Sequence, residues 1–232
     1  MPTSSSTPTA THAVVPAPRG QRAASSRAWA WTGVAAGALG LASIQTSLAG
    51  SVDWQATQGD AGAMLADASG KQGTYLLFHT VTALCAVAVP VFAAGLHRRL
   101  DQQAPAGSLL GRVAGWGLLL VAVALLLGSG LDTQYMLALA EPDVLVPESA
   151  AFYTDWVATV PWLWLGAGLS GVALAVASLR HSAAPRWIGV VSLLLGGITL
   201  VAGISPFQYL AGFTGPVWLL VVALGFALGD RR

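Results

Sequence analysis

The chain has 232 residues, of which 55% are apolar and only 9% are charged, and its formal net charge is +1. This balance lies outside the range of soluble globular domains and indicates that a lipid bilayer is the solvent. A large soluble domain is therefore excluded, and we expect the bilayer, not nucleic acid, as the partner.

Six apolar stretches alternate with short polar ones, and a hydrocarbon core of about 30 Å requires about 20 apolar residues per helix. The sequence therefore predicts an all-α, polytopic membrane protein built as a six-transmembrane-helix bundle. The expected spans cover residues 28–49, 75–96, 109–131, 157–179, 187–204 and 209–228, within a transmembrane domain of residues 28–232. Residues 1–27, rich in Ser, Thr, Pro and Ala, are expected to form a disordered cytoplasmic tail.

The connections carry further local signals. Between the first two spans, Asp60 precedes a stretch typical of a short helix and is expected near its N-terminus. The segment 141–155 mixes prolines with aromatic residues, as expected for a segment resting on the membrane interface. The third span has an apolar extension through Tyr135 to Ala140, which leaves its end open.

Basic and acidic residues separate to opposite sides of this pattern. Every arginine falls on one side, Lys71 is the only basic residue on the other, and most carboxylates accompany Lys71. Because short cytoplasmic loops carry the excess of Lys and Arg, we expect both termini in the cytoplasm of a bacterial cell (inner) membrane protein.

Several polar residues share the outer boundary of the spans, namely His79, Asp132, Asp155, Gln45, Gln134, Gln208 and Tyr209. In one interpretation they form an outward-facing polar pocket in which Asp132 or Asp155 pairs with His79, directly or through one water, as a proton-coupled or cation-binding site. In the other, they are polar side chains that meet headgroups and water where spans end. If the third span continues to Ala140, Asp132 lies inside a helix and requires a partner.

The chain contains no HExxH, CxxC, GxSxG, Walker or GxGxxG motif, so no catalytic residue, metal site or cofactor is predicted. One alternative is a membrane redox subunit with haem held by His97 and His181, or by His79. Another is a structural subunit of a membrane complex or a homo-oligomer, using small-residue pairs such as Gly33 and Gly37.

The turn from Leu179 to Gly189 reads LRHSAAPRWIG and precedes the fifth span. With the six-span layout and the long first outer loop, it resembles the inner turn of a broad class of uncharacterised bacterial six-span membrane proteins, mostly known as domains of unknown function. The Ala-, Gly-, Leu- and Trp-rich composition is similar to that of actinobacterial proteins. The resemblance implies the topology and no functional residue. From the polar residues at the outer boundary, we expect a non-enzymatic accessory or small-solute-handling membrane protein.

Overall fold

The computed structural model describes residues 27–141, 143 and 145–229, and this part of the chain contains helices and no strand. Six helices are long and apolar enough to cross a membrane, as expected for a multi-pass membrane protein. The all-α class and the six candidate spans are thereby confirmed. Of the N-terminal tail predicted to be disordered, residues 1–27, all but Arg27 lie outside the described residues.

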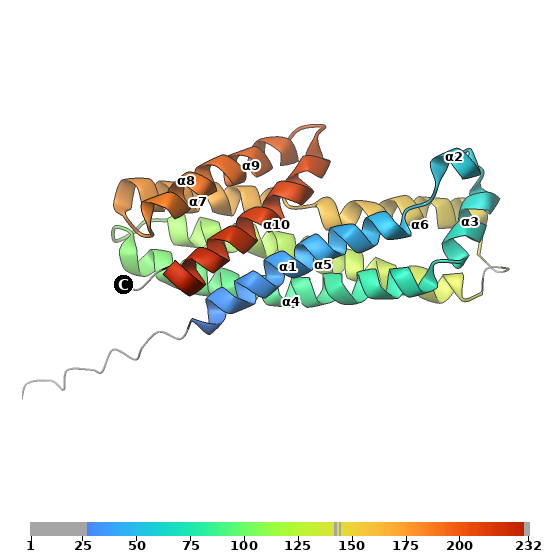
Figure 1. Cartoon of the computed structure of the whole chain (residues 1–232), viewed down its shortest axis with the longest axis horizontal. Helices are drawn as coiled ribbons and strands as arrows, with labels where there is room; N and C mark the ends of the chain where they lie inside the picture. Colours follow the sequence, from blue (N-terminus) through green and yellow to red (C-terminus); the bar gives the residue numbers. More distant parts are fainter. Residues whose placement is uncertain (1–26, 142, 144, 230–232) are drawn as a thin grey trace, which may run out of the picture.

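Three long helices run side by side along the long axis of the molecule: α1 (Ala28–Gly50), α4 (Gln72–Gln103) and α5 (Leu110–Leu139) (Figure 1). Between α1 and α4, the short helices α2 (Trp54–Thr57) and α3 (Ala61–Ser69) lie at one end of the bundle. Asp60 caps α3 as expected, because its Oδ1 accepts a hydrogen bond of 2.7 Å from the amide of Ala63.

The second half of the chain supplies the three remaining candidate spans. The fourth comes in two pieces, α6 (Pro147–Thr159) and α7 (Leu165–His181), joined through the 3-10 turn η2 (Val160–Trp162). The fifth comprises α8 (Arg186–Val191), the π-helical segment η3 (Ser192–Gly196) and α9 (Gly197–Gly203). The sixth is α10 (Gln208–Leu224), which continues into the π-helical segment η4 (Gly225–Gly229).

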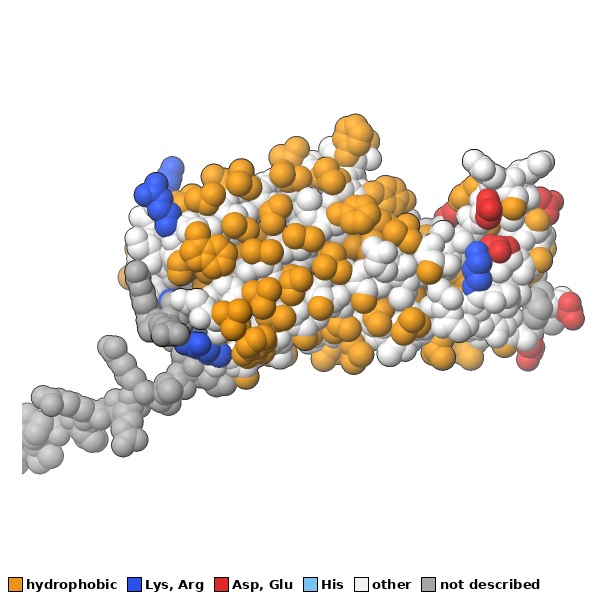
Figure 2. All heavy atoms as spheres, in the orientation of Figure 1, with side chains coloured by type: hydrophobic (Ala, Val, Ile, Leu, Met, Phe, Trp, Pro, Cys, Tyr) orange, Lys and Arg blue, Asp and Glu red, His pale blue; other side chains and the backbone are white. Residues whose placement is uncertain are grey.

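Charged residues gather at the two opposite ends of the molecule, and apolar side chains cover most of the surface between them (Figure 2). We call these the basic end, where Arg98, Arg112, Arg180 and Arg186 lie at helix ends, and the acidic end, which carries α2, α3 and α6. The separation of charge along the sequence is thus also a separation in space for the described residues.

The candidate spans differ so much in length that one hydrocarbon thickness does not fit them all. At 1.5 Å per residue, α4 with 32 residues and α5 with 30 residues are roughly 48 and 45 Å long. The fifth span, Arg186–Gly203, has 18 residues and is roughly 27 Å long, close to the thickness of a hydrocarbon core. Parts of α1, α4, α5 and α6 therefore extend beyond the α9–α10 turn towards the acidic end (Figure 1).

This extension differs from the expected boundaries, because α5 continues to Leu139 and α6 occupies most of the segment predicted to rest on the interface. The reason is a second apolar core that the extension forms for itself. It comprises Leu65, Ala68, Tyr75, Phe78, Tyr135, Leu139, Ala150 and Val157. Helices that pack against one another are stabilised by this contact, so they can continue beyond the apolar run of a single span.

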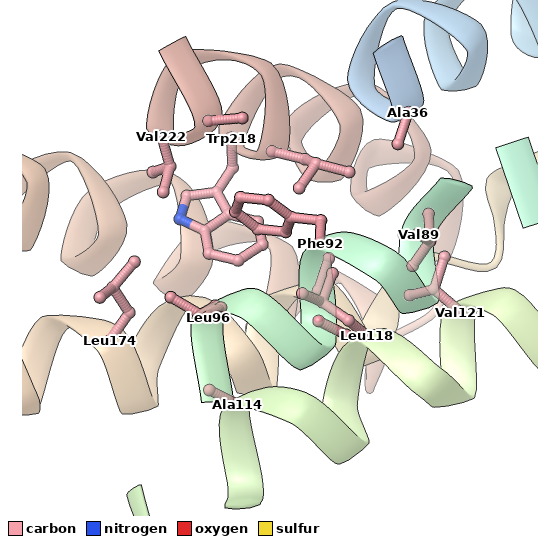
Figure 3. Close-up of a cluster of buried hydrophobic side chains, with 14 of the residues drawn as sticks. Ala36, Val89, Phe92, Leu96, Ala114, Leu118, Val121, Leu174, Trp218 and Val222 are labelled. Carbon is pink, nitrogen blue, oxygen red and sulfur yellow. The ribbon is translucent and has the colours of Figure 1, made fainter. Parts of the chain in front are cut away.

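The main core lies between the candidate spans. Phe92 and Leu96 of α4 meet Leu118 of α5 and Trp218 of α10 there (Figure 3). Where α5 crosses α7, a Cβ on Gly117 would lie only 2.4 Å from the carbonyl oxygen of Gly166. Such contacts require glycine and hold helices together in lipid, where the hydrophobic effect gives no attraction between them.

Candidate functional site

Asp132 is the one acidic side chain buried inside the helical bundle among the described residues. It lies on α5, two turns before the helix ends, and is 1% exposed. Neither carboxylate oxygen has a hydrogen-bond partner within the described part of the chain. Because burying an ionised carboxylate without a partner costs free energy, this group requires a compensating ligand or a proton.

Small residues on α5 create the surroundings of Asp132. One turn towards the basic end, Gly128 and Ser129 are both buried. A Cβ on Gly128 would lie 1.9 Å from Cγ1 of Val160, so the 3-10 turn η2 packs directly on the backbone of α5. The buried face that carries Asp132 therefore lies next to the interruption between α6 and α7.

His79 contacts the same helix but does not pair with Asp132. Its Nδ1 lies 3.1 Å from the carbonyl oxygen of Ser129, 3.2 Å from the Ser129 hydroxyl and 3.5 Å from the Thr133 hydroxyl. His79 is half-buried, so its ring joins a buried hydroxyl to the surface of the α4–α5 pair. His79 therefore contacts the residues three before and one after Asp132 along α5, and it makes no direct hydrogen bond to Asp132 itself.

The hydroxyl groups of Tyr75 and Tyr135, the two tyrosines of the second core, already have partners. The Tyr75 hydroxyl donates to the carbonyl oxygen of Gly50 at 2.9 Å. Thr154 donates to the carbonyl oxygen of Ala150, so the Tyr135 hydroxyl, 2.5 Å away, donates to Thr154. Neither tyrosine therefore has a proton left to donate to the carboxylate.

A small cavity of about 10 Å³ lies between α1, α4 and α6 in the extension. Its polar lining comes from the hydroxyl-bearing residues Thr46, Ser47, Ser51, Tyr75 and Thr154. This volume accommodates about one water molecule. Asp132 does not line this cavity, so the cavity and the carboxylate are separate features of the acidic half.

Among the residues that the structure describes, no Lys or Arg side chain near Asp132 offsets its charge. Lys71, the only lysine of the chain, forms an ion pair with Asp67 at 2.7 Å and also donates to the carbonyl oxygen of Ser51. The described arginines belong to the basic end. Arg112, on the same helix as Asp132, is 20 residues away, which corresponds to roughly 30 Å along the axis.

None of the other predicted pocket residues forms a hydrogen bond with Asp132. Asp155 of α6, Gln45 of α1 and Gln134 of α5 are exposed. Gln208 lines a separate apolar groove with Leu163 and Leu165 of the interrupted span. Tyr209 packs edge-on against Trp162, and its hydroxyl lies 3.5 Å from that of Thr159.

His97 and His181, the pair considered as haem ligands, lie at the basic end. Nε2 of His97 is 2.9 Å from Asp101, and both side chains of this pair are partly exposed. His181 is exposed at the last position of α7. Over the described ranges, no three His, Cys, Asp or Glu side chains group as metal ligands.

The interruption of the fourth span is the structural element next to the site that the sequence prediction missed. We expected a continuous span over 157–179, whereas the helix stops at Thr159 and resumes at Leu165. Pro161 is the signal in the sequence, since proline removes a backbone donor and clashes with the preceding turn. The indole of Trp164 then donates to the carbonyl oxygen of Pro161 at 3.0 Å, which satisfies one group that the interruption exposes.

No protein-family model, curated protein or solved structure matches this chain.

Proposed function

We propose that this chain is a six-span protein of a bacterial inner membrane that handles a small cation, the proton included, at the outer side, and that Asp132 is the group that binds it. In this proposal the protein is not an enzyme. Both termini lie in the cytoplasm because the basic end carries the arginines, as the positive-inside rule requires. The acidic end then faces outward.

The observation that carries the proposal is the burial of the Asp132 carboxyl without a hydrogen-bond partner among the described residues. A carboxylate in such a place is stabilised when it takes up a proton or a cation. Ionisable residues inside membrane bundles commonly mark ion pathways and proton relays.

The neighbouring interruption of the fourth span supports the same function. Non-helical backbone at membrane depth is tolerated where protein buries it or where it lines a cavity, and transporters place ion sites beside such interruptions. Here η2 packs on α5 one turn from Asp132. A carboxyl group beside a discontinuous helix has the chemistry of a small-cation site.

The test is an acid titration of the purified protein in lipid nanodiscs, in which infrared difference spectroscopy follows the C=O stretch of protonated carboxyl groups. We expect a band in the wild type that Asp132→Asn lacks. Glu148→Gln is the matched control, since Glu148 is an exposed carboxylate on α6. The control variant should keep the band.

Repeating the titration in sodium chloride instead of choline chloride identifies the ion. A shift of the titration to lower pH shows competition by the metal ion, and an unchanged titration assigns the site to the proton. A band that persists in Asp132→Asn, or a wild type without such a band, would overturn the proposed function.

The two alternative functions have weaker support. A haem protein requires ligands in a dry site, and both His97 and His181 are solvent-accessible in this fold. A structural subunit would present its small-residue pairs to a partner, but Gly33 and Gly37 pack inside the chain against Phe92 and Leu220. Membership in the bacterial six-span class is a separate proposal, which rests on the sequence resemblance.

A further inference from the structure

We infer that the ligand of Asp132 is the proton, and that it reaches the carboxyl group from the outer side through His79 and Ser129. This inference rests on the proposed function and names both its ligand and its route. It follows from one juxtaposition: a half-buried imidazole contacts a buried hydroxyl that lies one helical turn from the buried carboxyl.

His79 occupies the position that a proton entry group requires. It lies on α4, 18 residues before His97, which is roughly 27 Å along the axis and therefore near the outer boundary of a bilayer. Its ring is partly exposed, whereas Ser129 is 4% exposed and Asp132 is 1% exposed. Histidine is also the side chain that changes its charge in the physiological pH range.

The contacts of the ring define its hydrogen positions. The carbonyl oxygen of Ser129, 3.1 Å from Nδ1, can only accept, so Nδ1 carries the hydrogen. The Ser129 hydroxyl oxygen, 3.2 Å from the same nitrogen, shares this hydrogen bond as a second acceptor. The proton of the Ser129 hydroxyl therefore points away from the imidazole.

The transfer conserves every proton. Nε2 of His79 takes up a proton from the outer side, and the Nδ1–H bond breaks as its proton passes to Oγ of Ser129. The original hydroxyl proton of Ser129 leaves Oγ and forms an O–H bond with Asp132. The imidazole is then neutral with its proton on Nε2, and a ring flip or exchange with solvent restores the first tautomer.

Helix geometry sets the last step. Residues three apart on a helix are neighbours on one face, with about 5–6 Å between their Cβ atoms. Ser129 and Asp132 have this spacing, and both belong to the buried face of α5. Rotation of the serine side chain, or one bridging water, spans the remaining distance.

Other titratable groups around this route offer no competing path. On α4, Tyr75 donates its proton to a backbone carbonyl, and at the start of this helix Lys71 pairs with Asp67 of α3. Tyr135 of α5 donates to Thr154. From α6, the exposed Asp155 acts electrostatically on Tyr135, and the titratable Tyr153 stacks on Tyr135; α1 has no titratable side chain.

The ligand set favours the proton over a metal ion. A hard cation such as Ca²⁺ takes six to eight oxygen ligands, and Mg²⁺ demands a near-ideal octahedron. In the described chain, Asp132 belongs to no group of three or more His, Cys, Asp or Glu side chains that could hold a metal ion, and the hydroxyls of Tyr75 and Tyr135 are engaged with other groups. One oxygen of the carboxylate is enough for a proton.

The experiment uses the protein in lipid nanodiscs. The pH of the surrounding solution is lowered rapidly, and the rise of the infrared band of the Asp132 carboxyl group is followed in time. We expect His79→Gln and Ser129→Ala to slow the rise on the order of a hundredfold, the typical effect of a positioned proton-transfer group, and to leave its final amplitude unchanged. Added imidazole should restore the rate of His79→Gln. Thr80→Val is the matched control, because Thr80 is exposed beside His79 and its hydroxyl bonds only its own helix at Leu76.

The outcomes separate the two proposals. A band that rises at the wild-type rate in both His79→Gln and Ser129→Ala would overturn the route and leave the proposed function intact. A sodium-dependent shift of the equilibrium titration would overturn the proton as the sole ligand. Loss of the band in the wild type would contradict the proposed function itself.

Discussion

At the scale of single residues, polar side chains in the acidic half of the bundle satisfy one another or their own helix. Thr46, Thr80 and Thr154 each donate to the backbone carbonyl four residues earlier, and Ser43 bonds Thr82 at 2.6 Å. Asp132 is the exception among the buried side chains here. A group that the fold leaves without protein partners lowers the stability of the protein when it is charged. The effect of this charge can therefore be measured by unfolding.

Asp132→Asn is expected to raise the thermal unfolding midpoint at alkaline pH, where the wild type holds a charged carboxylate in the bundle. The gain should be on the order of 1–3 kcal/mol, because an unsatisfied buried group costs more free energy when it is charged than when it is neutral. At acidic pH the wild-type carboxyl is protonated, so the difference should shrink towards zero. Thermal unfolding of the detergent-purified proteins over a pH series is the measurement.

The exposed Glu148→Gln variant is the control for this comparison, because it removes an equal charge from α6 without emptying a buried site. Its midpoint should follow that of the wild type at every pH. An Asp132→Asn protein that is less stable than the wild type at alkaline pH would contradict an uncompensated charge at this position.

At the scale of elements, the contact between α5 and the interruption of the fourth span determines the shape of the site. Val160 rests on the bare backbone at Gly128, and the turn η2 holds it there. The adjoining Trp164 is fully buried and ties the segment to Pro161. The close packing of the interruption on α5 therefore depends on one glycine of that helix.

Gly128→Ala is expected to destabilise the protein by about 1–3 kcal/mol, because the new methyl group would overlap the side chain of Val160 and force the turn away from α5. Gly130→Ala is the matched control on the same helix, since a Cβ there meets nothing within 4 Å. Alanine has the higher helix propensity, so Gly130→Ala should be neutral or stabilising by up to about 1 kcal/mol. Equal midpoints for the two variants in thermal unfolding would refute the tight contact.

How far the sequence predicts these elements depends on what decides each of them. Hydropathy is a local property, and it is sufficient to locate all six candidate spans. The ends of α5 and α6 depend instead on a tertiary core in which Tyr135 and Leu139 pack against α3 and α4, so hydropathy misses them. Pro161 indicates the interruption in the sequence, but only the contact of the neighbouring Val160 with Gly128 shows how the interruption packs on α5.

The site was predictable in part for a similar reason. An aspartate inside an apolar run stands out, so Asp132 could be selected from the sequence, and its burial followed once α5 proved continuous. Shared depth is a weaker guide than shared face. Gln45 and Gln134 have the right depth but point outward, whereas Ser129, which does contact His79, looked like an ordinary small residue.

At the scale of the whole molecule, the proposed topology assigns the acidic end to the outside. We expect a cysteine introduced at Asp60 to react with a membrane-impermeant maleimide in intact cells, and a cysteine at Arg180 to react only after the cells are opened. Cys85 is buried, and Cys85→Ala gives a background without competing thiols. The reverse labelling pattern would place the termini outside and would contradict the outward orientation of the acidic half.

The unequal lengths of the fifth span and of α5 also bear on which bilayers suit this protein. A hydrophobic segment of roughly 27 Å allows little tilt. The fifth span, and not the longer helices, therefore sets the hydrocarbon thickness that suits the protein. A thicker membrane would have to become thinner around the fifth span, and the free-energy cost of this hydrophobic mismatch rises with every ångström. The protein should therefore favour thin membranes, in which the carboxyl-bearing stretch of α5 stays level with the lipid headgroups.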